Sequence, residues 1–175
     1  LRRMFLTTIS LAKDSLEAIK KGNYNDLPAI AKLEATQNKM YMFCSRVVNI
    51  AGHKKFKKPS FIYLFLHRFE DVADYYKYLI DYIASLGNEK LKLNKEILSL
   101  YEKTIVMLEM LYNMYYKYSE DKDEQILTIK HEVVNKGHEL LEKVSKKEIR
   151  MVHYLIEIAG LIYSSSSPIH AISVD

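Results

Sequence analysis

The sequence predicts an all-α protein built from six long helices, and three observations support this fold class. Five glycines and three prolines among 175 residues are too few for the many tight turns of a sandwich or a barrel. Apolar residues make up 49% of the chain and recur at spacings of three and four, the period of an amphipathic helix. Because long helices with short links form antiparallel up-down bundles, we expect that architecture.

The first half of the chain predicts three helices, each with a terminal signal. Gly22 suits the left-handed position that follows the last turn of the first helix. Asp26 is a good N-cap for the second helix, and Gly52 is expected to end it. Ser60 is expected to cap the third helix, which carries the most regular apolar stripe in the chain. The expected ranges are residues 2–21, 26–51 and 60–86.

The second half predicts three more helices. The fourth spans 94–119, and the acidic segment 120–123 is expected to form a turn that breaks it. The fifth spans 123–144. Ser145 and Glu148 have the spacing of a capping box, so the sixth helix is expected to begin there. The serine run that ends at Pro168 is expected to terminate this helix and to leave a loose tail.

The six helices fall into two sets of three, residues 1–88 and 89–175. Residues 32–34 (Lys-Leu-Glu) match residues 130–132 (Lys-His-Glu) at an offset of 98. Residues 69–74 in the third helix match residues 155–160 in the sixth at an offset of 86. This repeated order predicts two tandem three-helix repeats within one compact domain.

Two carboxylates, Glu70 and Asp74, lie one turn apart on the third helix, away from its apolar stripe. Like charges at this spacing repel by about 0.2–0.5 kcal/mol. A bound cation would remove that cost, because hard oxygen ligands suit Mg²⁺, Ca²⁺, Mn²⁺ or iron. Glu34 and Asn38 have the same spacing on the second helix and would complete an oxygen-rich patch. In the alternative interpretation the patch is ordinary solvated surface, in which Lys77 pairs with Asp74 or with Asp81.

Other polar features are less specific. His67, one turn before Glu70, would add a nitrogen ligand. The basic loop 53–58 suits phosphates, acidic headgroups or an acidic partner, or is only solvated. The 14 tyrosines fit a subunit interface as well as core edges. No zinc-binding spacing, glycine-rich phosphate loop or nucleophile arrangement occurs, so the sequence gives no basis for an enzyme.

Charge and cysteine content bear on location. A net charge of +4 is compatible with nucleic acid or an anionic surface and requires neither. The single cysteine, Cys44, cannot form an internal disulfide, which favours a reducing, cytoplasmic location. No run of 18 apolar residues occurs, so no membrane span is expected. The sequence starts with Leu1 instead of an initiator Met, and residues 1–5 show no signal-peptide pattern, so we expect a further segment before it.

The segment Arg68-Phe-Glu-Asp-Val-Ala-Asp-Tyr75 resembles the acidic signature of PhoU domains, with Glu70 and Asp74 matching its two acids. The stretch 1–5 followed by 13–19 is similar to the opening helix of archaeal PhoU-domain regulators, which often carry an AbrB-like DNA-binding segment before it. PhoU domains are two three-helix repeats, so the resemblance covers nearly the whole chain. It implies a PhoU-like six-helix up-down bundle.

The resemblance also implies a function. PhoU-domain proteins are cytoplasmic regulators of phosphate uptake that signal between a phosphate transporter and a sensor kinase or other transcriptional output. Many form homo-oligomers, and their acidic motifs hold clusters of divalent metal or iron. Nucleic acid would be contacted only through a segment outside this chain.

The second repeat departs from the family pattern. Gly160 stands at the position of Asp74, and Ile156 stands at the position of Glu70. We therefore expect at most one metal site, in the first repeat. Its candidate ligands are Glu34, Asn38, Glu70 and Asp74. The alternative function is an accessory or dimerisation module of another system, such as ion transport, without metal. The missing second acidic pair disfavours a third reading, a metal-storing or metal-dependent enzyme.

Overall fold

The computed structural model describes residues 1–87 and 93–173, and helices are the regular structure found within those ranges. The long helices are α1 (Arg2–Lys21), α3 (Leu33–Lys55), α4 (Pro59–Ser85), α5 (Lys95–Tyr116), α6 (Glu120–Leu141) and α7 (Lys146–Ser164). Shorter elements are the 3₁₀ turn η1 (Tyr24–Asp26), α2 (Leu27–Ala31) and α8 (Ser166–Ser173). The expected all-α fold is confirmed, and no helix in the described part is long and apolar enough to cross a membrane.

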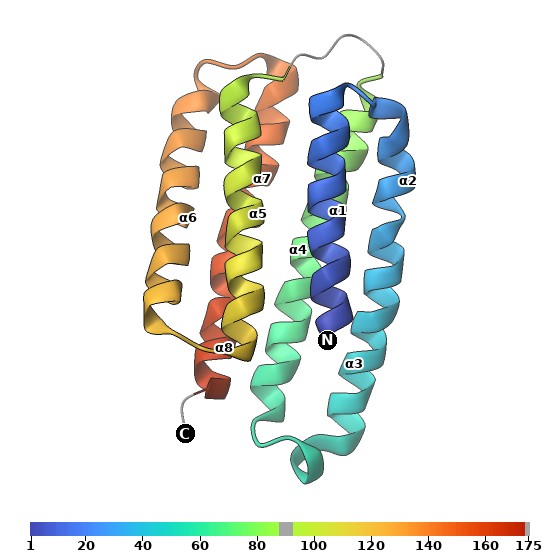
Figure 1. Cartoon of the computed structure of the whole chain (residues 1–175), viewed down its shortest axis with the longest axis vertical. Coiled ribbons are helices and arrows are strands. Elements are labelled where there is room, and N and C mark those ends of the chain that lie inside the picture. The colour runs from blue at the N-terminus through green and yellow to red at the C-terminus, as the bar shows by residue number, and fades with distance from the viewer. Residues whose placement is uncertain (88–92, 174–175) are drawn as a thin grey trace.

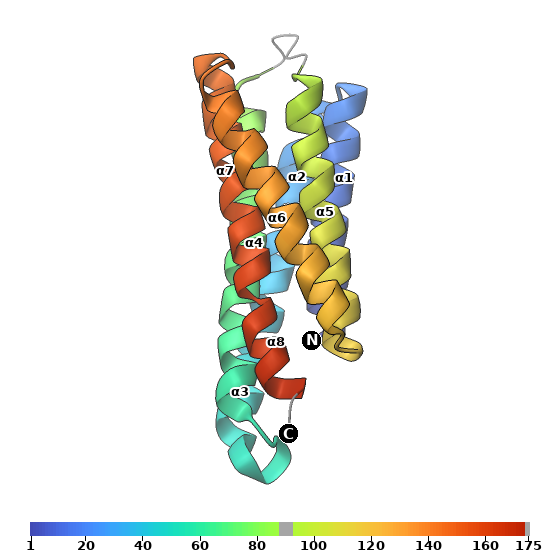
Figure 2. The same cartoon turned by 90° about the vertical axis from the view of Figure 1, so that its left-hand side faces the viewer.

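The helices form an elongated bundle in which α3 packs against α1 and α4, while α6 packs against α5 and α7 (Figure 1). The two groups meet along α1–α5 and along α4–α7. Both of these pairs are antiparallel, as Figures 1 and 2 show. The expected boundary between the repeats, at residues 88 and 89, lies outside the described residues.

Two exposed ion pairs mark the register of α1 against α5. Lys13 Nζ lies 2.5 Å from Glu109 Oε1, and Lys20 Nζ lies 2.5 Å from Glu102 Oε1. Each pair is exposed to solvent and contributes at most about 1 kcal/mol. The register therefore depends mainly on what is buried between the helices.

A chain of buried hydroxyl groups joins α1, α4 and α5 in the core. The Tyr76 hydroxyl donates to Thr104 Oγ1 over 2.9 Å, and Thr104 donates to the Tyr101 carbonyl over 2.7 Å. The Tyr101 hydroxyl lies 2.8 Å from Ser15 Oγ. All four residues are buried. Each hydroxyl therefore has a partner, and a buried hydroxyl without one would cost about 1–3 kcal/mol.

The second predicted helix is divided in the structure. It begins as the 3₁₀ turn η1, continues as α2, bends at Lys32 and continues as α3. The expected Asp26 cap makes no side-chain hydrogen bond. At Gly52 the backbone leaves the helical region, with φ 47° and ψ −140°, and one further turn follows. Gly52 therefore interrupts the helix where expected but does not end it.

The acidic segment 120–123 is not the turn that the sequence suggests. It forms the first turn of α6, while residues 117–119 make the connection. Glu120, Asp121 and Asp123 lie where the amide groups at a helix start are unpaired, and negative charge is favourable there. The capping box at the start of α7 is confirmed, because the Ser145 backbone N–H donates to Glu148 Oε2 over 3.1 Å.

The expected loose tail is also wrong, because residues 166–173 form α8 and pack against α4. Pro168 has no N–H to donate to the carbonyl of Ser164, four residues earlier, so one helical hydrogen bond is missing. Arg68 of α4 donates to that carbonyl instead. The proline thus interrupts the helix and leaves an acceptor that a distant side chain uses.

The two glycines inside helices have different surroundings, which gives a matched pair of variants. A Cβ on Gly137 would lie 2.7 Å from both Cδ1 and Cγ1 of Ile156, whereas a Cβ on Gly160 would meet nothing within 4 Å. We expect Gly137→Ala to lower the free energy of unfolding by about 1–3 kcal/mol through overpacking. Gly160→Ala should raise it by up to about 1 kcal/mol through helix propensity.

Urea unfolding of both variants tests this contrast. Adding Ile156→Ala to Gly137→Ala should remove most of the overpacking cost, because the atoms that clash are gone. A Gly137→Ala protein as stable as Gly160→Ala would contradict the close packing of α6 on α7.

Candidate functional site

Glu34, near the start of α3, is a carboxylate held almost out of solvent. The residue is 7% exposed. The side-chain amide of Asn38 donates to its Oε1 over 3.1 Å. Its Oε2 lies 3.9 Å from Nζ of Lys77 on α4, and Lys77 is also 3.9 Å from Asp81. Because a buried carboxylate needs polar partners, Asn38 and Lys77 are what allow Glu34 to stay in this position.

Glu70 and Asp74 lie half-buried on α4, one turn apart. Burial raises the pKa of Glu70, and the nearby charges of Asp74, Asp71 and Glu34 raise it further. Burial also raises the pKa of Asp74, Glu34 adds to the effect, and Lys77 opposes it. The Tyr78 hydroxyl donates to Asp74 over 3.4 Å. Burial is therefore the main cause of both raised pKa values, and the neighbouring carboxylates add to it.

The structure brings together the residues that the sequence singled out. Glu34 of α3 pairs with Lys77 of α4, one turn beyond Asp74, so this part of α3 lies against the surface of α4 that carries Glu70 and Asp74. Asn38 joins the group through its hydrogen bond to Glu34. We call Glu34, Asn38, Glu70 and Asp74 the carboxylate patch. Lys77 pairs with Glu34 and Asp81 across this patch.

A second group of ligand-type atoms overlaps the patch. One nitrogen of His67 and carboxylate oxygens of Glu70 and Asp71 lie within 4.8 Å of one another. Nδ1 of His67 is 3.4 Å from the Tyr41 hydroxyl, which orients the ring. The sequence reasoning included His67 but missed Asp71. The spacing of i, i+3 and i+4 from residue 67 places all three on one helix face and could have indicated it.

Gln37 lies one turn beyond Glu34 on the same helix. It is fully buried, and neither atom of its amide group has a hydrogen-bond partner among the described residues. Buried amides in native proteins are nearly always paired, so an unpaired one calls for an explanation. Gln37 shares a face of α3 with Glu34, Asn38 and Tyr41, since their spacing is three and four residues. Its carboxamide oxygen is a further hard donor on that face.

The matching region between α6 and α7 has no such chemistry. Ile156 stands where α4 has Glu70, and its side chain lies close to Gly137 of α6. Gly160 stands where α4 has Asp74 and has open space around it. The pair of carboxylates one turn apart on α4 therefore has no counterpart at the positions 86 residues later on α7.

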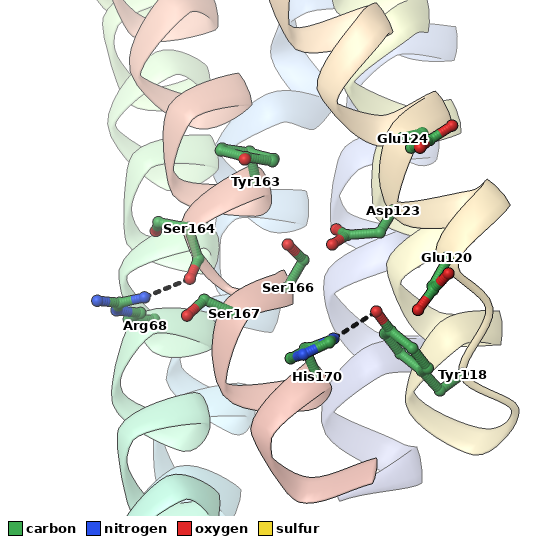
Figure 3. Close-up of a pocket in the computed structure, with 10 residues that line it drawn as sticks. All are labelled: Arg68, Tyr118, Glu120, Asp123, Glu124, Tyr163, Ser164, Ser166, Ser167 and His170. Atoms are coloured by element: carbon green, nitrogen blue, oxygen red, sulfur yellow. Dashed lines mark hydrogen bonds between the residues drawn. The ribbon is translucent and has the colours of Figure 1, made fainter. Parts of the chain in front are cut away.

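A cavity of about 460 Å³ between α6 and α8 was not anticipated from the sequence (Figure 3). The Tyr118 hydroxyl lies 2.5 Å from Nδ1 of His170, closing one side. Asp123 points from α6 into the space beside Ser166 (Figure 3), and Oδ1 of Asp123 is buried without a partner among the described residues. The cavity was not predicted because the residues after the serine run were expected to form a loose tail and not a helix. Apolar residues at 162, 168 and 169 were the available signal for a further helix.

Among the described residues, the ligand-type atoms that lie close enough together for one hard cation are those of His67, Glu70 and Asp71, and Glu34 and Asp74 lie outside that group. No protein-family model matches the chain, and no curated protein matches it. A functional assignment for this chain therefore depends on its fold and on the chemistry of the carboxylate patch.

The raised pKa values of Glu70 and Asp74 predict that the free energy of unfolding depends on pH. Their ordinary pKa values are 4.5 and 3.8. As pH rises through this range the unfolded chain loses these protons first, so the folded state loses stability towards neutral pH. We expect Glu70→Gln with Asp74→Asn to raise Tm by about 1–2 °C at neutral pH. The difference should vanish in acid, where both carboxyls are protonated in either state.

Thermal unfolding monitored by circular dichroism across this pH range, in chelator, measures the effect. Glu139→Gln with Glu142→Gln, at exposed positions on and just after α6, makes the same change in net charge and is the control. A double variant at 70 and 74 that is less stable than wild type at neutral pH would contradict the pKa directions.

Proposed function

We propose that this protein is a PhoU-like regulatory adaptor of phosphate homeostasis that works in the cytoplasm through protein contacts. The observation that carries the proposal is the carboxylate patch at the α3–α4 interface of a six-helix up-down bundle. The acidic signature that suggested the family lies on α4 and faces a nearly buried glutamate of α3. A solvated helix surface would not need the Asn38 and Lys77 contacts that hold Glu34.

The patch is proposed to bind one divalent cation or iron. Glu34, Glu70 and Asp74 would supply carboxylate oxygens, and His67 and Asp71 extend the donor set beside Glu70. The bound cation would neutralise the mutual repulsion of these acids and draw α3 and α4 together. The second group of helices has Ile156 and Gly160 at the matching positions, so one site per chain is proposed.

The adaptor role rests on surfaces available for partners. Leu6, Val106 and Tyr116 expose large apolar side chains on α1 and α5. Apolar groups of this size are typical of contact surfaces when they cluster. We propose that partners include a phosphate transporter or its sensor and transcription proteins, and a second copy of this chain. Any contact with nucleic acid would come from a segment outside this chain.

One observation favours the alternative, a metal-free accessory or dimerisation module of another transport system. Nζ of Lys77 lies 3.9 Å from Glu34 and acts on Asp74. A lysine in this place supplies positive charge that a metal would otherwise supply. The two functions therefore make opposite predictions for removal of Lys77.

Cation binding is tested by thermal unfolding with and without Mn²⁺, Mg²⁺ or Fe²⁺, and by elemental analysis of protein purified without chelator. A cation at about 100 times its Kd should raise the free energy of unfolding by about 2.7 kcal/mol, or Tm by about 5–10 °C. Glu70→Ala with Asp74→Ala should abolish this shift, whereas Glu139→Ala with Glu142→Ala should keep it.

Lys77→Gln separates the two functions. If the patch binds metal, removing the competing ammonium group should tighten cation binding. If Lys77 replaces the metal, the variant should show no response to cations; in chelator it should lose stability in either case, because Lys77 also holds Glu34. The second result would overturn the metal part of the proposal and favour the metal-free module.

The regulatory role is tested by deleting the gene in its host and measuring phosphate uptake and phosphate-responsive transcription. Deletion should raise both when phosphate is plentiful, and the wild-type gene should restore control. Unchanged uptake and transcription would overturn the regulatory proposal regardless of whether the patch binds metal.

A further inference from the structure

Charge is unevenly distributed along the chain. Residues 35–69 contain seven of the 26 lysines and arginines and none of the 22 acids. This segment therefore carries +7, while the rest of the chain carries −3. The segment makes up nearly all of α3, the connection at 56–58 and the first part of α4. Although the net charge of the chain is small, residues 35–69 form one strongly cationic structural element, which we call the α3–α4 hairpin.

The hairpin lies at one end of the molecule and extends beyond the other helices (Figures 1 and 2). Its exposed cationic residues near the tip include Arg46, Lys54 and Lys55. Lys58 donates to the Ala171 carbonyl of α8 over 2.9 Å, which fixes the base of the tip to the bundle. The cationic end is therefore presented on a defined support.

Large apolar side chains are exposed on the same element. Met42, Phe43 and Ile50 are 62%, 68% and 80% exposed. Their spacing places them on one face of α3, and Lys39 and Arg46 lie on that face between them. The opposite face of α3 is turned to the core, where Val48 is buried. Phe61 and Leu64, at the start of α4, add further exposed apolar surface to the hairpin.

Cations interleaved with exposed Phe, Ile and Met side chains match the boundary of an anionic bilayer. Headgroup phosphates attract the lysines and arginines, and the acyl boundary takes up the apolar groups. Nucleic acid would satisfy the cations but offers no apolar layer for Ile50 or Met42. We propose that the α3–α4 hairpin docks this protein on an anionic phospholipid surface, and this docking is independent of the carboxylate patch.

The test is co-sedimentation of the full chain with phosphatidylcholine vesicles that contain a one-third share of phosphatidylglycerol. The protein should bind these vesicles, bind pure phosphatidylcholine far more weakly, and dissociate in high salt because the attraction is screened. Lys54→Gln with Lys55→Gln should lower the partition coefficient about 30-fold. Lys143→Gln with Lys146→Gln makes the same charge change at the opposite end of the bundle (Figure 1) and should change it little.

A second pair of variants tests the apolar contribution. Phe43→Ser with Ile50→Ser should weaken binding by about tenfold or more. Leu6→Ser with Val106→Ser, at exposed positions on α1 and α5, should leave binding unchanged. All four positions are exposed, and unchanged circular dichroism and Tm confirm that each variant is folded.

Several results would overturn the proposal. Equal binding to neutral and anionic vesicles would contradict electrostatic docking. The same holds if the lysine variants of the hairpin and the control lysine variants lose equal amounts of vesicle binding. Binding to polyglutamate but not to vesicles would assign the hairpin to an acidic protein partner. A third outcome is that the protein forms dimers and does not bind vesicles. If Phe43→Ser with Ile50→Ser dissociates those dimers, the face is a contact with a second copy of the chain.

Discussion

The packing of α1 against α5 and of α4 against α7 is the constraint on which the rest of the molecule depends. Tyr76 and Tyr101 are fully buried at the junction of α1, α4 and α5, and their hydroxyls find partners on different helices. A slip of any one helix would leave a buried hydroxyl unpaired. This locks the rotation of α4, with Tyr76 turned inwards. The same rotation turns Glu70 and Asp74 towards α3, so the core determines where the carboxylates face.

Much of this arrangement could be predicted from local patterns in the sequence. The apolar period predicted the observed range of α1, and the capping box predicted the observed start of α7. The pairing of Glu70 with Asp74 follows from one helical turn. What could not be predicted depends on contacts between distant residues. One such contact is the hydrogen bond from Arg68 to the Ser164 carbonyl at the end of α7, which joins residues 96 positions apart. Likewise, helical spacing cannot show that Glu34 is nearly buried or that Lys77 pairs with it.

The interface between α3 and α4 differs in chemistry from the interface between α6 and α7. Between α3 and α4 that space includes charged and polar groups such as Glu34, Asn38 and Lys77. Between α6 and α7, Gly137 lets Ile156 approach closely, so the contact is apolar. A close apolar contact is rigid, since moving it opens a void. The charged interface can respond to protons, because the pKa values of Glu70 and Asp74 are raised, and the apolar interface beside it is rigid.

The uneven charge has a consequence for the molecule before it touches anything. The hairpin carries +7 and the rest of the chain carries −3, so the end of the molecule that the hairpin tip forms is cationic. In the field of a negatively charged surface, a torque turns the hairpin end forwards while the two are still separated by about a Debye length. When a molecule arrives in this orientation, a larger fraction of its encounters with the surface leads to binding. The arrangement of charge therefore acts on the rate of encounter as well as on the strength of contact.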